Sequence, residues 1–331
     1  MAEPDDPYER LGIPRDRYGR PMVVPPGGGK ATAYTRCTTY VGVLEDTYNL
    51  SRWQQRMVAL GLAQRPDLVL AAAAHHDDKD ELNKVCQSAM DAAAAGAAAG
   101  IGTALHKVTQ RIDRGEDVEL KTLPEAYRAD IRAYTDATAA LKRIAVEQFV
   151  VNDDLKVGGT PDLVVEFNGE RYIADKKTGS IEWGAGKIAM QLAMYSRSVF
   201  YDHETRTRTP IGVNQDLGIV IHLPAGEGTC RLQWVNISAG WKAVQLATDV
   251  RTWRARKKLI YPFDPVELVE EIFPGAEVIT LDEQIEAATT RADLEALYRA
   301  NRSEWTDKHT RAAKLRTTRL HQQSLRNLTQ R

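Results

Sequence analysis

The chain has 331 residues, of which 43% are hydrophobic and 27% are charged, and its formal net charge at pH 7 is −1. This composition is typical of a globular protein with a sizeable core, and it excludes a chain that binds nucleic acid through a basic total charge. Three widely spaced cysteines exclude a disulfide framework and a four-cysteine iron–sulfur cluster. The acidic N-terminus lacks an apolar signal core, and no apolar run is as long as a membrane span, so we expect a cytoplasmic protein without a membrane segment.

Secondary-structure patterns change along the chain. Residues 1–35 carry proline and glycine clusters and are predicted to form an irregular arm. Apolar residues recur at helical spacing over 36–140, which predicts a helical region. Residues 141–260 alternate strand-like runs with helices, one of them over 183–201, in the order β-β-β-α-β-β-α, and 261–331 are again helical. The predicted fold is mixed α/β, with a central mixed sheet flanked by helices and helical additions at both ends.

Two polar residues between positions 100 and 150 could take part in metal binding. His106 falls within a predicted helix, where a single histidine is more often a core or surface residue than a ligand. Its imidazole could nevertheless join two carboxylates on a metal such as Mn²⁺ or Mg²⁺. Glu147, on the first predicted strand, could add a carboxylate or could be an ordinary surface residue.

A hairpin is predicted within "GGTPDLVVEFNGERYIADKKTG", residues 158–179. Asn168 and Gly169 both tolerate the positive φ of a type I′ turn, which is the strongest short-range hairpin signal. Such a turn makes Phe167 face Glu170, and the same register places Asp162 opposite Asp175. Lys177 shares the face of Asp175, because side chains alternate along a strand.

Facing carboxylates in this hairpin suggest a metal site. Their Cβ atoms would lie about 5 Å apart, where like charges repel. A divalent cation is the usual partner for two carboxylates held so close. The ammonium of Lys177 beside them could polarise a water or stabilise developing negative charge. The alternative is a surface hairpin whose terminal acids point into water.

The helix predicted after the hairpin presents polar side chains on one face. Lys187, Gln191 and Tyr195 are each four residues apart, so they project together. The amide and the phenol could hold a phosphate or orient a water. The alternative is a packing helix that exposes Gln191 and buries the apolar residues around it.

Two local basic patches occur despite the near-neutral total. The run 251–258 has no acid and contains Arg251, Arg254, Arg256, Lys257 and Lys258. From Lys308 to Arg331 there are seven lysines or arginines and no acid. Such patches can contact phosphates, although a solvated helix face and a frayed tail are equally open interpretations.

Taken together, His106, Glu147, the string "GGTPD", the string "IADKKTG" and the following "QLAMY" resemble the PD-(D/E)XK nuclease superfamily. The closest subgroup is the RecB-type nucleases, which include CRISPR-associated and phage exonucleases, and the style resembles exonucleases encoded by phages of actinobacteria. The most specific part is D-x-K-T-G with Q-x-x-x-Y about a dozen residues later. The resemblance covers roughly residues 100–240 and implies a restriction-endonuclease-like core.

The resemblance also implies residue roles. The metal, Mg²⁺ or Mn²⁺, would be held by His106, Asp162, Asp175 and the backbone carbonyl of Lys176. Lys177 would be the catalytic lysine and Glu147 an accessory acid. Gln191 and Tyr195 would organise the site and touch the DNA backbone. Many relatives carry a four-cysteine iron–sulfur cluster, and none is expected here because the chain has three cysteines.

These observations predict a metal-dependent DNA exonuclease that leaves a 5′-phosphate, acting in recombination, replication or repair. Its partner would be DNA, single- or double-stranded, with a free end. Lys187 and the 251–258 run would contact phosphates. A structure-specific endonuclease, a catalytically weak DNA-binding recombination partner and a structural protein remain alternatives. A homo-oligomer or a recombination partner protein is a further candidate for assembly.

Overall fold

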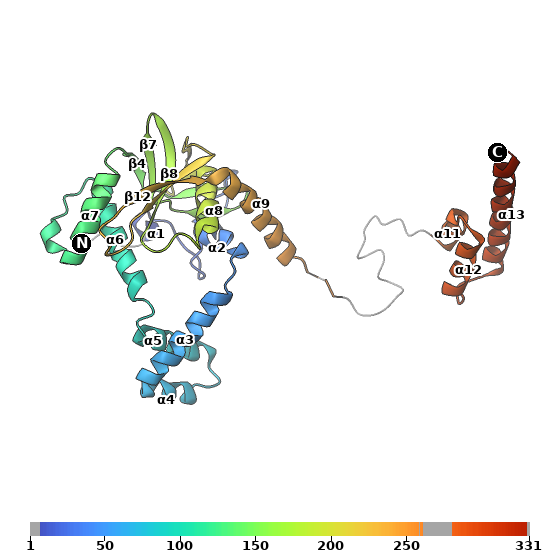
Figure 1. Cartoon of the computed structure of the whole chain (residues 1–331), viewed down its shortest axis with the longest axis horizontal. Coiled ribbons are helices and arrows are strands. Elements are labelled where there is room, and N and C mark those ends of the chain that lie inside the picture. Colours follow the sequence, from blue (N-terminus) through green and yellow to red (C-terminus); the bar gives the residue numbers. More distant parts are fainter. Residues whose placement is uncertain (1–6, 258, 261–279, 330–331) are drawn as a thin grey trace. The chain divides into compact units, whose positions relative to one another are not determined.

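A five-stranded mixed sheet forms the centre of the first of two units into which the chain divides, Met1–Ala255 and Arg256–Arg331. The computed structural model describes residues 7–257, 259–260 and 280–329. The predicted mixed α/β class is confirmed, because mixed sheets are flanked by helices (Figure 1). Among these residues no single helix is long and apolar enough to cross a membrane. The bent pair Tyr48–Gln64 and Pro66–Ala74 reaches that length and apolar composition only when its two helices are taken together.

The first unit contains a two-stranded sheet and two five-stranded sheets. Its helices are α1 (Pro7–Arg10), α2 (Cys37–Val41), α3 (Tyr48–Gln64), α4 (Pro66–Ala74), α5 (Lys79–Ala92), α6 (Ala97–Asp113), α7 (Glu125–Ala137), α8 (Ala185–Ser196) and α9 (Ile237–Arg254), with 3-10 turns at Gly42–Leu44 and Leu120–Thr122. Its strands are β1 (Met22–Val23), β2 (Thr32–Ala33), β3 (Thr35–Arg36), β4 (Lys142–Val146), β5 (Val150–Asn152), β6 (Val157–Gly159), β7 (Leu163–Phe167), β8 (Glu170–Lys177), β9 (Val199–Tyr201), β10 (Arg208–Pro210), β11 (Leu217–His222) and β12 (Arg231–Asn236).

The main sheet has the order β12-β11-β8-β7-β4. Its pairs are antiparallel except β8 with β11, which run parallel. One face packs against α8 and α9 through Val164, Ile173 and Val220. The other face packs against α7 through Val165 and Ile221. Both faces are covered, which explains why β8 is buried almost continuously from Tyr172 to Lys176.

The predicted hairpin register is confirmed. Phe167 pairs with Glu170 and Leu163 pairs with Ala174 across β7 and β8. Asn168 and Gly169 have φ values of +51° and +81°, as a type I′ turn requires. The local turn chemistry therefore fixes which residues of the two strands face each other.

A second five-stranded mixed sheet, β10-β9-β5-β6-β3, corrects the expectation of one central sheet. The run "AVEQFVV" was predicted to be one strand, but it breaks after Val146. The chain leaves the main sheet there and enters the second sheet at Val150. Glu147 sits at this break with φ +47°, a conformation that a continuing strand does not allow.

Helix α8 is shorter than the predicted 183–201. It ends at Ser196, and Val199–Tyr201 form β9. The packing interpretation of this helix holds in part, because Met190, Leu192 and Met194 are buried. Gln191 is half-buried rather than exposed.

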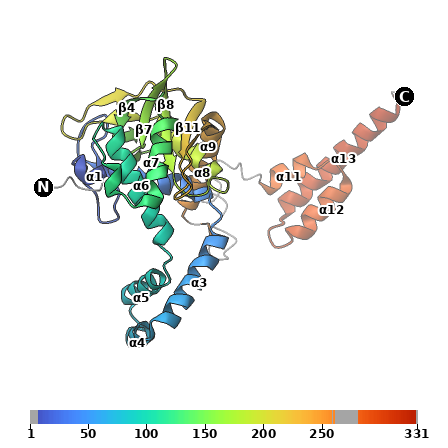
Figure 2. The same ribbon diagram turned by 60° about the vertical axis from the view of Figure 1, so that its left-hand side comes forward.

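Three helices stand apart from the sheets in both Figure 1 and Figure 2: α3, α4 and α5. They share their own apolar cluster around Leu68, Val85 and Ala89. Gly61 of α3 lies against Ala89, and a Cβ there would be 1.8 Å from the Ala89 carbonyl oxygen. Residues 1–35 contribute β1, β2 and the buried side chains of Ile13, Val23 and Tyr34.

The second unit is a helical bundle of α11 (Leu281–Ala287), α12 (Arg291–Ala300) and α13 (Asp307–Thr329). Its core is built around Ile285, Ala288 and Leu294. Thr280 and Thr290 each begin a helix with a reciprocal capping box. All three helices fall within the stretch 261–331 that is predicted to be helical.

Candidate functional site

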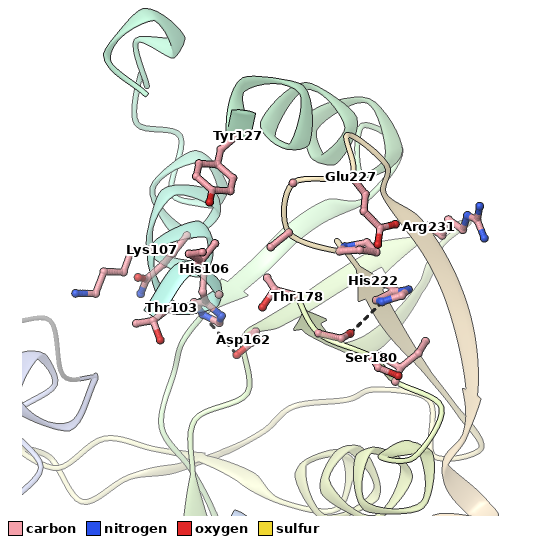
Figure 3. Close-up of a pocket in the computed structure, with 18 of the residues that line it drawn as sticks. Thr103, His106, Lys107, Tyr127, Asp162, Thr178, Ser180, His222, Glu227 and Arg231 are labelled. Atoms are coloured by element: carbon pink, nitrogen blue, oxygen red, sulfur yellow. Dashed lines mark hydrogen bonds and ion pairs between the residues drawn. The ribbon is translucent and has the colours of Figure 1, made fainter. Parts of the chain in front are cut away.

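A cavity of about 1430 Å³ opens at the C-terminal ends of β8 and β11. Its walls come from α6, the loop after β8, and the β11–β12 end of the main sheet with its connecting loop, and Figure 3 shows many of the side chains that line it. Small-molecule pockets commonly measure about 300–1000 Å³. The space therefore suits a segment of a larger ligand.

A histidine and two carboxylates converge at the α6 side of the cavity. His106, Glu147 and Asp162 each offer a ligand atom, and these atoms all lie within 4.8 Å of one another. His106 Nε2 is 3.0 Å from Glu147 Oε1 and 3.7 Å from Asp162 Oδ1 (Figure 3). Burial alone would lower the pKa of His106, but the charges of Asp162 and Glu147 outweigh it and raise that pKa.

The two acids meet because both lie where the chain passes between the sheets. Glu147 connects β4 to β5, and Asp162 connects β6 to β7. These crossings run side by side, since the Glu147 amide donates to the Asp162 carbonyl at 3.0 Å. Helix α6 comes close enough through Gly102, where a Cβ would lie 2.4 Å from Thr178 Oγ1. The absence of a side chain at Gly102 thus allows His106 to reach the acids.

Asp175 and Lys177 lie on one face of β8, near Asp162. Lys177 Nζ is 2.5 Å from Asp175 Oδ2, and Asp175 is 2% exposed. Burial, and next the charge of Asp162, raise the pKa of Asp175 to about 6. Burial would lower the pKa of Lys177, but Asp175 outweighs it and the pKa is raised. Lys177 therefore carries an ammonium at neutral pH, and the three groups influence one another's charge.

Lys176 divides its contacts between two sides of β8. Its amide donates to Asp162 Oδ2 at 2.7 Å. In an extended strand the N–H and C=O of one residue point to the same edge, so the carbonyl also faces the edge where Asp162 lies. Its Nζ lies 3.0 Å from Oδ2 of Asp113, a fully buried residue of α6. Sequence reasoning missed Asp113, although it follows His106 by seven residues on the same helix face.

Tyr195 occupies a position that does not allow the predicted direct contact with DNA. It is 4% exposed and packs against Cys37 and Gly159. A Cβ at Gly159 would lie 2.8 Å from a ring carbon of Tyr195, which gives the glycines of "GGTPD" a packing role. Gln191 donates to the Tyr195 hydroxyl at 3.4 Å. Burial raises the pKa of Tyr195 well above its usual value, so the phenol stays protonated.

Glu147 is held by partners that the sequence did not predict. Arg10 Nη2 lies 3.0 Å from Glu147 Oε2, and Gln110 Nε2 donates to the same oxygen. Arg114 Nη2 is 3.8 Å away. Gln110 and Arg114 follow His106 by four and eight residues, a helical spacing that could have indicated them. Arg10, from the N-terminal arm, had no such signal.

The basic residues predicted to contact DNA do not line this cavity. Lys187 Nζ pairs with Glu45 at 2.8 Å. The guanidinium of Arg251 lies over the ring of Tyr40, 4.5 Å from its centroid. Arg254 is exposed in the last turn of α9. These three therefore mark a different surface from the cavity wall.

The rest of the predicted basic run is not part of the first unit. Arg256 and Lys257 belong to the second unit, and Lys258 lies outside the described residues. Two other basic residues, Lys107 and Arg231, line the cavity. Neither was singled out from the sequence, because each stands alone among residues of mixed type.

The donor set fits a hard divalent cation. Mg²⁺ and Mn²⁺ favour carboxylate and carbonyl oxygens, and imidazole also suits Mn²⁺. Among the described residues, the group whose ligand atoms lie within 4.8 Å of one another is His106, Glu147 and Asp162. Asp175, predicted as a ligand, is not in this group and does not line the cavity, but its charge acts on Asp162. Asp175 Oδ2 is buried, and apart from the ion pair with Lys177 it has no hydrogen bond of acceptable geometry among the described residues. Such an oxygen is suited to accept a cation.

No model of a known protein family matches the chain, and no curated protein sequence matches it either. The functional proposal therefore draws on the chemistry and geometry of the site and on the motif resemblance.

Proposed function

We propose that this protein is a metal-dependent deoxyribonuclease, acting as an exonuclease, with a restriction-endonuclease-like core. The supporting observation is the convergence of His106, Glu147 and Asp162 at an open cavity. The Asp175–Lys177 pair is close enough to Asp162 to influence its charge, although neither residue lines the cavity. The exonuclease assignment comes from the motif resemblance to RecB-type nucleases. The large cavity is compatible with a polymeric substrate.

His106, Asp162, Asp175 and the Lys176 carbonyl would hold Mg²⁺ or Mn²⁺, which when bound would acidify a water and neutralise charge on the scissile phosphate. Glu147 lies 3.0 Å from Nε2 of His106, the ring nitrogen that also faces Asp162, so as the accessory acid it would lie within the metal site rather than behind the ring. Its own charge is already met by Arg10 and Gln110. Arg10 and Gln110 therefore hold this carboxylate in place beside the proposed metal.

Lys177 supplies a fixed positive charge in this scheme. The neighbouring Asp175 raises the pKa of Lys177, so the ammonium persists at neutral pH. A protonated amine cannot abstract a proton, but it can stabilise negative charge that develops on a phosphate. We therefore assign Lys177 to charge stabilisation, and cleavage would leave a 5′-phosphate, as the resemblance implies.

Digestion of end-labelled linear single- and double-stranded DNA, with Mg²⁺, Mn²⁺ or EDTA, tests this proposal. Asp162→Ala, Asp175→Ala and Lys177→Ala should each lower the cleavage rate by about 10²–10⁴-fold, as removal of a positioned catalytic group does. Asp154→Ala is the matched control, because Asp154 is exposed and does not line the cavity. Undiminished cleavage in EDTA, or in the Asp175→Ala protein, would contradict the mechanism.

Two rival functions give different results. A structure-specific endonuclease would cut covalently closed circular DNA as well as linear DNA, whereas an exonuclease requires an end. A DNA-binding recombination partner would retain DNA in a gel without degrading it. A third alternative is a purely structural protein, which would bind no cation at this site. A bound cation should raise the melting temperature, so the absence of metal-dependent thermal stabilisation would favour the structural role.

We also propose that the protein acts in the cytoplasm and that its partner is DNA. A second copy of the chain or a recombination partner protein is a further candidate for a binding partner. The cysteines support a reducing compartment, since Cys37, Cys86 and Cys230 are all free thiols. Thiol titration of the protein purified from its own cell would test this placement.

A further inference from the structure

The cavity extends beyond the metal-binding side chains to the β11–β12 end of the main sheet. There Lys177 pairs with His222, and His222 pairs with Arg231, in the register of three neighbouring strands. Residues paired in this way point to the same face of a sheet. At two strand spacings, Lys177 and Arg231 are about 10 Å apart at the backbone. Basic side chains thus form a row that leads away from the scissile position.

Arg231 is an exposed cation without an ion-pair partner among the described residues. It lines the edge of the cavity together with His222, and its guanidinium points outward, away from the other labelled side chains (Figure 3). The His222 ring is held in place, since its Nε2 lies 3.0 Å from the Gly179 carbonyl oxygen. Two acids also line the cavity, Glu227 on the connecting loop and Glu182 on the loop after β8. An exposed guanidinium that has no ion-pair partner among the described residues suits a phosphate.

The loop between β11 and β12, which lines this end of the cavity, is held in place by a buried residue of α7. Asp130 of α7 is fully buried, and its two carboxylate oxygens accept from the amides of Gly226 and Gly228, each at 2.7 Å. Both glycines have positive φ values, +81° and +63°, which other residues rarely adopt. The wall that carries Glu227 is therefore preformed, and a ligand entering here need not order it.

We propose that Arg231 binds a backbone phosphate of the nucleic acid strand next to the scissile phosphate. This proposal rests on the proposed function, and it names the direction in which the strand runs: from the His106 side across the ends of β8, β11 and β12. The cavity is larger than a mononucleotide-sized ligand needs. Repulsion from Glu227 weakens the same contact.

Binding of a fluorescein-labelled single-stranded oligonucleotide in EDTA, followed by anisotropy over a range of salt concentrations, tests the subsite. Arg231→Ala should weaken binding about three- to fivefold, and it should reduce the slope of log affinity against log salt by about 0.7–1. Glu227→Gln should strengthen binding. Arg171→Ala is the matched control, because Arg171 is an exposed sheet arginine near the hairpin turn, away from the cavity.

The outcomes separate this subsite from the nuclease proposal. If Arg231→Ala and Arg171→Ala bind alike while the wild-type protein cleaves DNA with Mn²⁺, the subsite is wrong and the nuclease assignment stands. If Arg231→Ala alone weakens binding and reduces the slope, but no DNA is cleaved, the subsite stands and the hydrolytic role fails. Absence of oligonucleotide binding by the wild-type protein overturns the subsite whatever the cleavage result.

Discussion

Asp113 offers the sharpest test of how the site is held together. Its side chain has no solvent exposure, and it contacts Lys176 Nζ at 3.0 Å, Arg143 Nε at 3.1 Å and the Tyr134 hydroxyl at 2.7 Å. Lys176 is itself only 2% exposed at its side chain. Asp113→Ala would leave a buried ammonium without a counter-charge. Breaking a buried pair in this way costs about 3–5 kcal/mol.

That cost predicts a large, measurable loss. For a unit of this size it corresponds to a fall in Tm of roughly 10 °C, and urea denaturation followed by circular dichroism would give the free energy of unfolding. Asp113 joins α6, which carries His106, to β8, which carries Asp175 and Lys177. We therefore expect variants that remain folded, such as Asp113→Asn, to lose metal affinity in isothermal titration as well as stability.

A double-mutant cycle isolates the charge effect. Lys176→Met removes the cation that Asp113→Ala leaves stranded, so the double variant should lose less stability than the sum of the two single variants, by about 0.5–3 kcal/mol. Arg143 keeps other acceptors, the carbonyls of Thr138 and Leu141. The view that Asp113 and Lys176 form a buried ion pair would be refuted if Asp113→Ala lowered the free energy of unfolding by less than about 1 kcal/mol. Strict additivity in the cycle would refute it as well.

Three further outcomes are expected. Gly102→Ala, which forces a Cβ against Thr178, should lower cleavage and metal affinity, whereas Gly100→Ala on the same helix meets nothing within 4 Å and should leave both unchanged in parallel assays. Burial raises the pKa of the Cys37 thiol to about 12, so iodoacetamide at pH 8 should leave it unmodified in the folded protein, and rapid modification by mass spectrometry would contradict its position. The pKa of Asp175, about 6 against an ordinary 3.8, means that its contribution to the stability of metal-free protein is present below pH 4 and is lost as the pH rises through 6. Asp175→Asn should abolish that part of the pH dependence in urea titrations, and an unchanged profile would count against it.

Local signals in the sequence predicted the hairpin well. The Asn168–Gly169 turn fixes the register by itself, and the register brings Asp175 and Lys177 to one face. Helical spacing likewise placed His106 on a helix and Gln191 in line with Tyr195. These features depend on residues within about twenty positions of one another, where turn chemistry and periodicity decide the outcome.

Features that depend on distant parts of the chain could not be predicted in the same way. The run around Glu147 reads as one continuous strand, because each half has β-forming residues, and nothing local indicates that the halves join different sheets. Arg10 reaches Glu147 across 137 positions. The pairing of His222 with Lys177 is a parallel contact between β8 and β11, which is set by the whole fold rather than by a turn.

The two-sheet architecture explains why the candidate site lies where it does. A residue inside a strand has its backbone groups paired and its side chain committed to one packed face. Glu147 and Asp162 lie at crossings between sheets, where the pairing is interrupted and a side chain can turn toward the cavity. Asp175 and Lys177, by contrast, stay on rigid β8, whose end lies beside those crossings. The site thus combines Glu147 and Asp162, which lie between the sheets, with Asp175 and Lys177, which lie on a strand. Helix α6 adds His106 and packs closely at Gly102. Each component depends on a different part of the fold, but Asp162 and Asp175 influence each other's charge and would hold the same cation, so substitutions at the crossings and on β8 should not be additive in their effect on metal binding.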